Sequence, residues 1–148
     1  MQRIADVMTR DVRSVAPQET IRRAAQVMDE LNVGALPVCD GRKLVGMVTD
    51  RDITVRAVAA GQSPDAAQVG EVMSVSVRWC FDDQTVDEVM EQMGDSQIRR
   101  VPVIDHDTKE LVGIVSLGDL ATKHSAQVDR TLEQISSPAE PDRRPPGS

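Results

Sequence analysis

The chain carries one set of motifs twice, and this internal repeat limits the possible folds more than any other feature. The stretch Gly46-Met47-Val48-Thr49-Asp50-Arg51-Asp52 returns as Gly113-Ile114-Val115-Ser116-Leu117-Gly118-Asp119. Val7-Met8-Thr9 returns 65 residues later as Val72-Met73-Ser74. Self-similarity at a nearly constant spacing is typical of one supersecondary unit that is built twice. We therefore predict two tandem repeats.

The first repeat, 1–65, has the hydrophobic pattern of a β-α-β-β-α unit. The expected elements are an extended piece at 12–15, an amphipathic helix at about 20–31, hairpin strands at 35–39 and 44–48, and a helical segment at 51–60. The helix is indicated by apolar residues that recur at helical spacing, and the hairpin by two short apolar runs around a polar turn. This order predicts a small sheet flanked by helices.

The second repeat, 66–124, follows the same order, with helices expected at about 85–94 and 117–124. About 60 residues bury only a marginal core, and each small sheet has a face that needs cover. We therefore expect an α+β fold in which the two β-α-β-β-α repeats pack about a pseudo-two-fold axis. Weak periodicity predicts a further helix at 125–136, and a tail rich in proline and charge at 137–148 is expected to be disordered.

The composition limits the partners that this chain can bind. A net charge of -7 and a pI near 4.8 argue against non-specific binding to nucleic acid or to an anionic membrane, because both need a basic surface. No stretch is apolar enough to span a bilayer, and the first residues lack the apolar core of a signal peptide. Cys39 and Cys80 are too few for a disulfide scaffold. We expect a cytoplasmic protein whose thiols are reduced and buried.

A hydroxyl residue followed three positions later by Asp ends each glycine-containing stretch. Thr49 and Asp52 form this pair in the first repeat, and Ser116 and Asp119 form it in the second. Each pair lies where a strand passes into a helix, so free backbone N–H groups are exposed beside it. An ionised Asp there can accept hydrogen bonds from both hydroxyls of a ribose, and the N–H groups can face an anion. The same spacing is that of a capping box, which starts a helix without any ligand.

The motifs, repeated in register over about 1–124, resemble a tandem pair of CBS domains. The resemblance rests on the two Val-Met-[Thr/Ser] segments, on the two glycine-containing stretches, and on Gly34-Ala35-Leu36-Pro37-Val38 and Arg100-Val101-Pro102-Val103-Ile104-Asp105. It is nearest to small stand-alone bacterial proteins that contain little besides the pair. The family implies flat dimeric discs that bind adenosine-containing ligands (AMP, ADP, ATP or S-adenosylmethionine) and regulate a partner protein.

Family geometry implies two nucleotide-binding clefts, each drawing on both repeats. The first cleft would combine Thr20, Val33, Gly34, Ala35 and Leu36 with Arg100, Ile114, Ser116 and Asp119. The second cleft would combine Thr85, Ile98, Arg99 and Val101 with Met47, Thr49 and Asp52. Arg100 would reach the phosphates in the first cleft, whereas its repeat counterpart, Ala35, leaves the second without that cation unless Arg51 replaces it. We expect the first cleft to be the better nucleotide site.

An interaction scaffold and an enzyme are the two alternatives to a nucleotide sensor. An interaction scaffold would leave the clefts empty or fill them with side chains. An enzyme would need a nucleophile–base set, a Walker-type Gly-Lys-[Ser/Thr] or a metal cluster, and the sequence offers none, so we expect no catalysis. His106 and His124 lack ligand-spaced neighbours, so no metal site is expected. We also expect no cofactor, since the adenine nucleotide would be a ligand. Trp79 is expected in the core, at a dimer interface or lining the second cleft. We expect a homodimer that acts on an unidentified partner.

Overall fold

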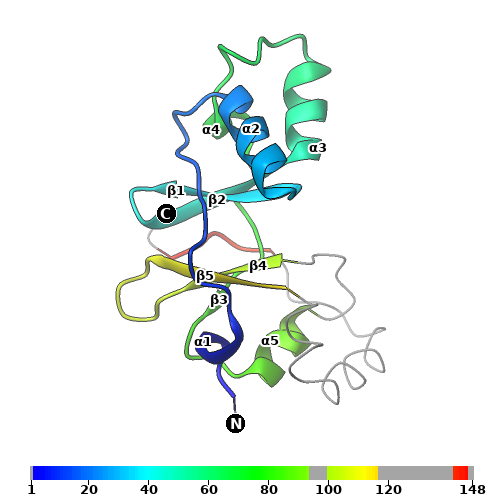
Figure 1. Cartoon of the computed structure of the whole chain (residues 1–148). Helices are drawn as coiled ribbons and strands as arrows, with labels where there is room; N and C mark the ends of the chain where they lie inside the picture. The colour runs from blue at the N-terminus through cyan, green and yellow to red at the C-terminus, as the bar shows by residue number, and fades with distance from the viewer. Residues whose placement is uncertain (1, 94–99, 117–141, 147–148) are drawn as a thin grey trace. The chain divides into compact units, whose positions relative to one another are not determined.

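The structure is a computed structural model that describes residues 2–93, 100–116 and 142–146. Contacts divide the chain into two compact units, which are described separately below (Figure 1). Unit 1 comprises Met1–Val12 and Arg78–Asp142, and unit 2 comprises Arg13–Val77 and Arg143–Ser148. Both units mix helices with strands, which confirms the expected α+β class.

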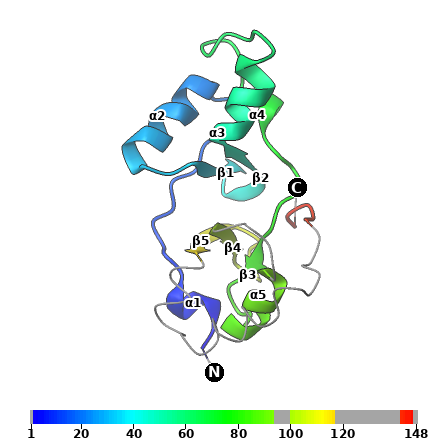
Figure 2. The same ribbon diagram turned by 90° about the vertical axis from the view of Figure 1, so that its right-hand side faces the viewer.

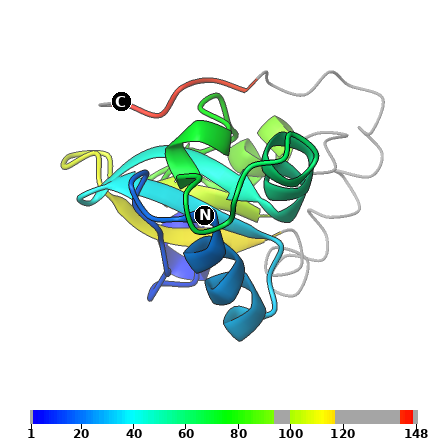
Figure 3. The ribbon, with the colours of Figure 1, turned by 90° about the horizontal axis from the view of Figure 1, so that it is seen from above.

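Unit 2 places its helices on one side of a β-hairpin. Its elements are α2 (Ile21–Leu31), β1 (Ala35–Asp40), β2 (Lys43–Thr49), α3 (Asp50–Asp52), the π-helical stretch η1 (Ile53–Val58) and α4 (Val69–Val72). β1 and β2 pair antiparallel, and Val15 forms a parallel bridge with Val38 of β1. Figures 1 and 2 show α2, α4 and the run of α3 and η1 above this hairpin, and Figure 3 views the same face from above. The predicted hairpin is therefore confirmed.

Helix α2 begins and ends where the sequence provides caps. The Thr20 hydroxyl accepts a hydrogen bond from the Arg23 amide at 3.1 Å, which satisfies one of the free N–H groups at the helix start. Asn32 ends the helix in the left-handed conformation, with a φ of 54°, and Asn tolerates this conformation better than most residues. The buried residues of the helix are Ile21, Ala24, Val27 and Met28. This spacing confirms the predicted amphipathic helix at about 20–31.

Unit 1 contains a three-stranded sheet with helices on one side. Its elements are α1 (Ile4–Val7), β3 (Cys80–Phe81), α5 (Val86–Met93), β4 (Arg100–Ile104) and β5 (Leu111–Ser116). β4 lies between β3, to which it is parallel, and β5, to which it is antiparallel. Figures 1 and 2 show α1 and α5 below this sheet. Trp79 and Cys80 are buried, which agrees with the burial expected for Cys80 and with the first of the three positions expected for Trp79.

Each repeat contributes its leading segment to the unit built mainly from the other repeat. Thr9 pairs antiparallel with Ile114 of β5 in unit 1, and Ser74 pairs in the same way with Met47 of β2 in unit 2. The helix α1, which precedes Thr9 in the chain, belongs to unit 1. The helix α4, which precedes Ser74, belongs to unit 2. The boundaries predicted at 1–65 and 66–124 describe the sequence repeats, whereas these contacts define the units.

The helical segment expected at 51–60 is shorter and mixed. One turn of α-helix, α3, passes into the wider π-helical turns of η1, which end at Val58. Gly61 follows with a φ of 77°, and Pro64 comes soon after. Both residues oppose a longer helix, because the left-handed conformation and the missing proline N–H end the hydrogen-bond ladder.

The C-terminal part of the chain is described only over 142–146. The helices predicted at 117–124 and 125–136 lie outside the described residues. The tail at 137–148 was expected to be disordered, and within its described part Arg143 forms an antiparallel bridge with Val77. Asp142 also forms an ion pair with Arg78 at 2.9 Å. Composition alone carries no information about these contacts, because they join residues about 65 positions apart.

Candidate functional site

The strand-to-helix junction of unit 2 carries the best-defined candidate for a ligand site. Thr49 ends β2, and Asp52 ends the turn of α3 that follows. The Asp52 amide donates to Thr49 Oγ1 at 3.0 Å, and the Thr49 amide donates to Asp52 Oδ2 at 3.0 Å. These two bonds form a capping box, so both side chains serve the helix start. They also bring a hydroxyl and a carboxylate together at the end of a strand.

One oxygen of the Asp52 carboxylate lies outside this capping box. Oδ2 accepts the Thr49 amide, whereas Oδ1 faces Nε of Arg56 at 3.9 Å. That separation allows an ion pair but is too long for a direct hydrogen bond. The Asp52 side chain is 12% exposed, so a ligand donor would meet a largely desolvated carboxylate. Charge-assisted hydrogen bonds to such a group are short and strong.

Gly34 and Asp50 are in close contact at the same junction. The Asp50 amide donates to the Gly34 carbonyl at 3.0 Å, and a Cβ on Gly34 would lie 3.1 Å from Asp50 Oδ2. Ala35 stands opposite Thr49 in the register of β1 and β2. Unit 2 therefore brings Gly34 and Ala35, expected in the first cleft, beside Thr49, expected in the second.

The remaining candidate residues of unit 2 have structural contacts. Thr20 caps α2 and forms a bridge with Gln68. Leu36 and Met47 are buried, and Val33 packs against the core of unit 2. These three apolar candidate side chains are thus packed within this unit.

The corresponding junction of unit 1 is described as far as Ser116. Arg100 stands opposite Ser116 in the register of β4 and β5, Val101 follows it as a buried residue, and Ile114 lies on β5. Arg100 is exposed, and its side chain makes no hydrogen bond or ion pair with any other described residue. Its guanidinium is therefore accessible to an anion. Three candidate residues lie outside the described residues, namely Ile98, Arg99 and Asp119.

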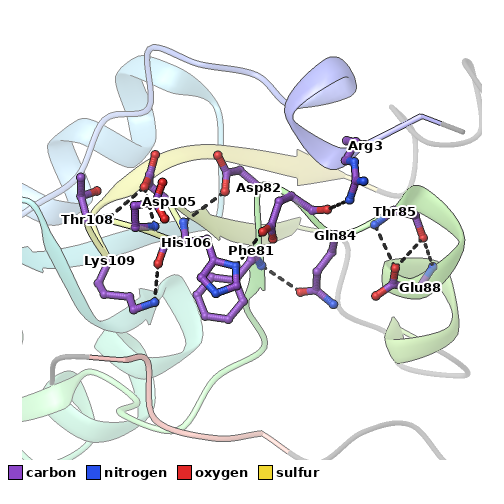
Figure 4. A network of polar contacts seen from close by, with 12 residues as sticks. Arg3, Phe81, Asp82, Gln84, Thr85, Glu88, Asp105, His106, Thr108 and Lys109 are labelled. Atoms are coloured by element: carbon purple, nitrogen blue, oxygen red, sulfur yellow. Dashed lines mark hydrogen bonds and ion pairs between the residues drawn. The ribbon is translucent and has the colours of Figure 1, made fainter.

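Thr85 lies directly before α5 and makes hydrogen bonds with Glu88 (Figure 4). Its hydroxyl accepts a hydrogen bond from the Glu88 amide at 3.2 Å and donates one to the Glu88 carboxylate at 3.0 Å. Thr85 also forms an antiparallel bridge with Arg3, whose guanidinium donates to the carbonyl of Asp83. The side chain of this candidate residue therefore caps a helix in unit 1.

His106 belongs to a polar and aromatic cluster at the turn between β4 and β5 (Figure 4). Its ring stacks on Phe81 with 4.5 Å between the ring centroids, and its Nδ1 lies 2.6 Å from Asp83 Oδ2. Lys109 Nζ lies 5.0 Å from the centroid of the Phe81 ring. These contacts hold the turn against the segment that follows β3. The His106 ring thus contacts an aromatic ring and a carboxylate, and the His106 amide donates to a second carboxylate, that of Asp82, at 3.1 Å.

Tertiary contacts explain why a glycine opens each repeated stretch, and these contacts are not visible in the local sequence. A Cβ on Gly46 would lie 2.4 Å from the carbonyl oxygen of Ser74. A Cβ on Gly113 would lie 2.5 Å from Met8 Sδ and 2.9 Å from the carbonyl oxygen of Thr9. Only glycine allows the leading segment of the other repeat to pass so close to the strand. Both glycines and both segments recur in the sequence, but their contact depends on tertiary structure.

The two cysteines are buried thiols, as expected from the sequence. Burial raises the pKa of the Cys39 thiol, and a hydrogen bond with Ser14 partly opposes this effect. A raised pKa keeps the thiol protonated and therefore poorly nucleophilic near neutral pH. This environment indicates a packing position for Cys39.

No helix among the described residues is both long and apolar enough to cross a membrane. No group of three or more His, Cys, Asp or Glu side chains among the described residues could hold a metal ion.

Comparison with known proteins identifies the family. The family model of the CBS domain matches the chain twice, at residues 4–58 and 69–125. The chain belongs to the CBS domain family. The first match contains the junction of Thr49 and Asp52, and the second contains that of Ser116 and Asp119. The resemblance seen in the motifs is therefore confirmed.

Two bacterial CBS-domain relatives are similar over most of their own length. The CBS domain-containing protein YhcV of Bacillus subtilis is 42% identical over 121 residues, which cover 82% of this chain and 84% of YhcV. Hypoxic response protein 1 of Mycobacterium tuberculosis is 42% identical over 117 residues, which cover 78% of this chain and 80% of that protein.

Solved structures agree with the CBS fold. A crystal structure of Hypoxic Response Protein I with two coordinated zinc ions matches with a TM-score of 0.73 and 40% identity, covering 83% of this chain and 98% of that one. A structure of CBSX2 in complex with AMP matches with a TM-score of 0.70 and 25% identity, covering 88% of this chain and 100% of that one. CBSX2 is a CBS-pair protein from Arabidopsis thaliana.

Proposed function

We propose that this CBS-domain chain is a cytoplasmic regulatory module that binds an adenine nucleotide between its repeats and signals to a partner protein. The observation that carries the proposal is the Thr49–Asp52 junction, where a largely buried carboxylate keeps one oxygen outside the helix cap. The ligand class is supported by the similarity to CBSX2, whose structure contains AMP. No catalytic step is part of this proposal.

The chemistry of the junction suits the sugar of a nucleotide. Asp52 Oδ1 accepts hydrogen bonds from the adjacent ribose hydroxyls, while Oδ2 keeps its bond to the Thr49 amide. The Thr49 hydroxyl has a second lone pair and a proton besides its bond to the Asp52 amide, so it can bind a sugar or phosphate oxygen. Ser116 and Asp119 perform the same tasks in the other cleft. Arg100, exposed on β4, binds the phosphates there.

The proposed nucleotide sites keep the residues expected from the sequence. The first site consists of Thr20, Val33, Gly34, Ala35, Leu36, Arg100, Ile114, Ser116 and Asp119. The second site consists of Met47, Thr49, Asp52, Thr85, Ile98, Arg99 and Val101. The ligand candidates are AMP, ADP, ATP and S-adenosylmethionine. We propose that the first site is the tighter one because it includes the Arg100 cation.

A second candidate function is a ligand-free interaction scaffold. The capping box of Thr49 and Asp52 supports it, because each side chain already satisfies a backbone N–H at 3.0 Å. A cap is worth about 1 kcal/mol, which explains the pair without a ligand. The two candidate functions make different demands on the charge of the Asp52 carboxylate. A cap needs only an acceptor oxygen, whereas recognition of two hydroxyls gains most from an ionised group.

The test is calorimetric titration of AMP, ADP, ATP and S-adenosylmethionine into the wild type, Asp52→Asn and Asp119→Asn. Asn keeps an acceptor oxygen for the cap but loses the charge. We expect each substitution to weaken nucleotide binding at its own site by about 10- to 100-fold, since hydrogen bonds to charged groups are worth roughly 1.5–3 kcal/mol.

Asp29→Asn is the matched control, because Asp29 is an exposed residue of α2 outside the proposed sites. Its affinity for nucleotide should equal that of the wild type. Unchanged affinity in both site variants would reject the ribose contacts. A wild type that binds none of the four ligands would support the scaffold instead.

We also propose that the module acts as a homodimer. The support is the family resemblance together with the exposed apolar residues Val55 and Val58, which are 51% and 57% exposed on η1. Light scattering at micromolar concentration should give the mass of two chains. A mass of one chain across that range would contradict this part of the proposal.

A further inference from the structure

Arg56 joins the candidate ligand site to the segment that leads out of unit 2. Its Nε lies 3.9 Å from Asp52 Oδ1, four residues earlier on the same helical run. Its Nη1 donates to the carbonyl oxygens of Val72 at 3.2 Å and Met73 at 3.3 Å. One guanidinium therefore contacts both the acidic side chain of the junction and the end of α4.

The contacted carbonyls stand at the start of a connecting segment, which we define as residues 73–77. Carbonyl groups at the end of a helix lack intrahelical partners, so a cation is favourable there. The segment is then fixed to β2, because Ser74 and Met47 exchange two backbone hydrogen bonds of 2.8 and 3.0 Å. The segment ends at Val77, and Arg78 is the first residue of this stretch that belongs to unit 1.

We propose that Arg56 couples the Asp52 carboxylate to the connecting segment, so that a nucleotide bound at Asp52 changes how firmly residues 73–74 are held. This inference rests on the proposed function, because it assigns a regulatory output to the same site. It also assigns Arg56 as a positioning residue, which acts on the ligand through Asp52.

The physical basis is competition for one carboxylate oxygen. In the ligand-free protein, Asp52 Oδ1 attracts Arg56 across 3.9 Å. Ribose hydroxyls that donate to this oxygen weaken that attraction and change the balance between the two sets of Arg56 contacts. A ligand can shift a conformational equilibrium only if it interacts differently with the two states. Competition at Asp52 supplies such a difference.

The coupling must also work in the opposite direction. If nucleotide binding changes the hold on the segment, a change in that hold alters nucleotide affinity by the same factor. The Arg56 side chain is 53% exposed, and ion pairs that are this exposed are weak. We therefore expect effects of about two- to five-fold.

The first experiment uses ligand-free protein and amide-resolved hydrogen exchange by NMR. The reporter is the Ser74 amide, which donates to the Met47 carbonyl at 2.8 Å. Arg56→Gln should speed its exchange by about two- to five-fold relative to the wild type. Arg56→Lys should give a smaller increase, because lysine keeps the charge but lacks the fork that reaches two carbonyls.

Arg22→Gln is the matched control, since Arg22 forms an exposed ion pair with Asp65 at 3.0 Å in the same unit. Its Ser74 exchange should equal that of the wild type. Equal exchange in Arg56→Gln and the wild type would overturn the hold of Arg56 on the segment. If Arg56→Gln does not fold, the same comparison is made with Arg56→Lys.

The second experiment repeats the exchange measurement with saturating AMP. AMP should change the Ser74 exchange rate in the wild type, and Arg56→Gln should lose most of that change. AMP that binds the wild type but leaves the rate unchanged would overturn the coupling while the proposed function stands. If calorimetry shows that no adenine nucleotide binds, the proposed function fails and the coupling fails with it.

Discussion

Ser74 and Met47 pair through two backbone hydrogen bonds, with 2.8 Å from the Ser74 amide to the Met47 carbonyl and 3.0 Å from the Met47 amide to the Ser74 carbonyl. The two residues belong to different sequence repeats but to one compact unit. Thr9 and Ile114 repeat the arrangement in unit 1, with bonds of 2.8 and 3.0 Å. Each unit is therefore completed by a segment from the other repeat.

The first prediction concerns Gly46, which lies close to the carbonyl group of Ser74. Gly46→Ala should lower the free energy of unfolding by about 1–3 kcal/mol, because the new Cβ forces backbone to move. The distance from this Cβ to the Ser74 carbonyl oxygen would be 2.4 Å. Urea unfolding followed by circular dichroism measures the loss.

Gly34→Ala provides the matched comparison for this substitution. Its added Cβ would meet only the Asp50 carboxylate, at 3.1 Å, and the end of a side chain can move aside. The loss should therefore be smaller than for Gly46→Ala. Equal losses in the two variants would show that the close approach of Ser74 is not the cause.

The second prediction concerns the acid stability of the turn around Asp105 (Figure 4). Amide hydrogen bonds from Thr108 and then Asp107 hold the pKa of the Asp105 carboxyl below its ordinary value of 3.8. A lowered folded-state pKa stabilises the protein at pH values above the ordinary pKa, and this contribution is lost as the pH falls through the lowered value.

Asp105→Asn should therefore be less stable than the wild type near neutral pH, and the difference should shrink below about pH 4. Urea unfolding at a series of pH values measures it. Asp107→Asn is the control, because the Asp107 contact with Asp105 uses the backbone amide. A difference between wild type and Asp105→Asn that stays constant down to about pH 2 would contradict the prediction.

The third prediction concerns the C-terminal residues. Asp142 pairs with Arg78 at 2.9 Å, and Arg143 exchanges two backbone hydrogen bonds of 3.1 Å with Val77. A chain that ends at residue 141 should show faster amide exchange at Val77, because the acceptor carbonyl is gone. Asp142→Asn should cost only about 0.5–1 kcal/mol, since Asp142 is about half exposed.

Arg144→Gln is the control for the C-terminal contacts, because Arg144 is exposed and lies next to Arg143. Its Val77 exchange and its stability should match those of the wild type. Val77 exchange that is unaffected by removal of residues 142–148 would show that the backbone pair is absent in solution.

Much of the local structure follows from the sequence because its causes are local. The Thr20 cap, the apolar spacing of α2 and the turn at Gly41 each lie within a few residues of the element that they define. The hairpin of β1 and β2 follows from two short apolar runs and a polar turn for the same reason. The Thr49–Asp52 pair was equally visible, as both a capping box and a candidate ribose ligand.

Arg56 and the two motif glycines show where sequence reasoning stops. Arg56 contacts carbonyls 16 and 17 residues away, and no periodic pattern connects positions at that separation. Gly46 and Gly113 are recognisable as repeated residues, but the atoms that exclude a side chain belong to the other repeat. Such contacts depend on how the chain folds back, which local propensity does not specify.

The sequence by itself determined the duplication, the order of the described helices and strands and the membership in the CBS domain family, because these depend on motifs and periodicity. Only the tertiary structure decided which repeat receives each leading segment. Val7-Met8-Thr9 and Val72-Met73-Ser74 are so alike that either could, by its own pattern, lie against either strand. The choice is fixed by long-range backbone pairing of Thr9 with Ile114 and of Ser74 with Met47.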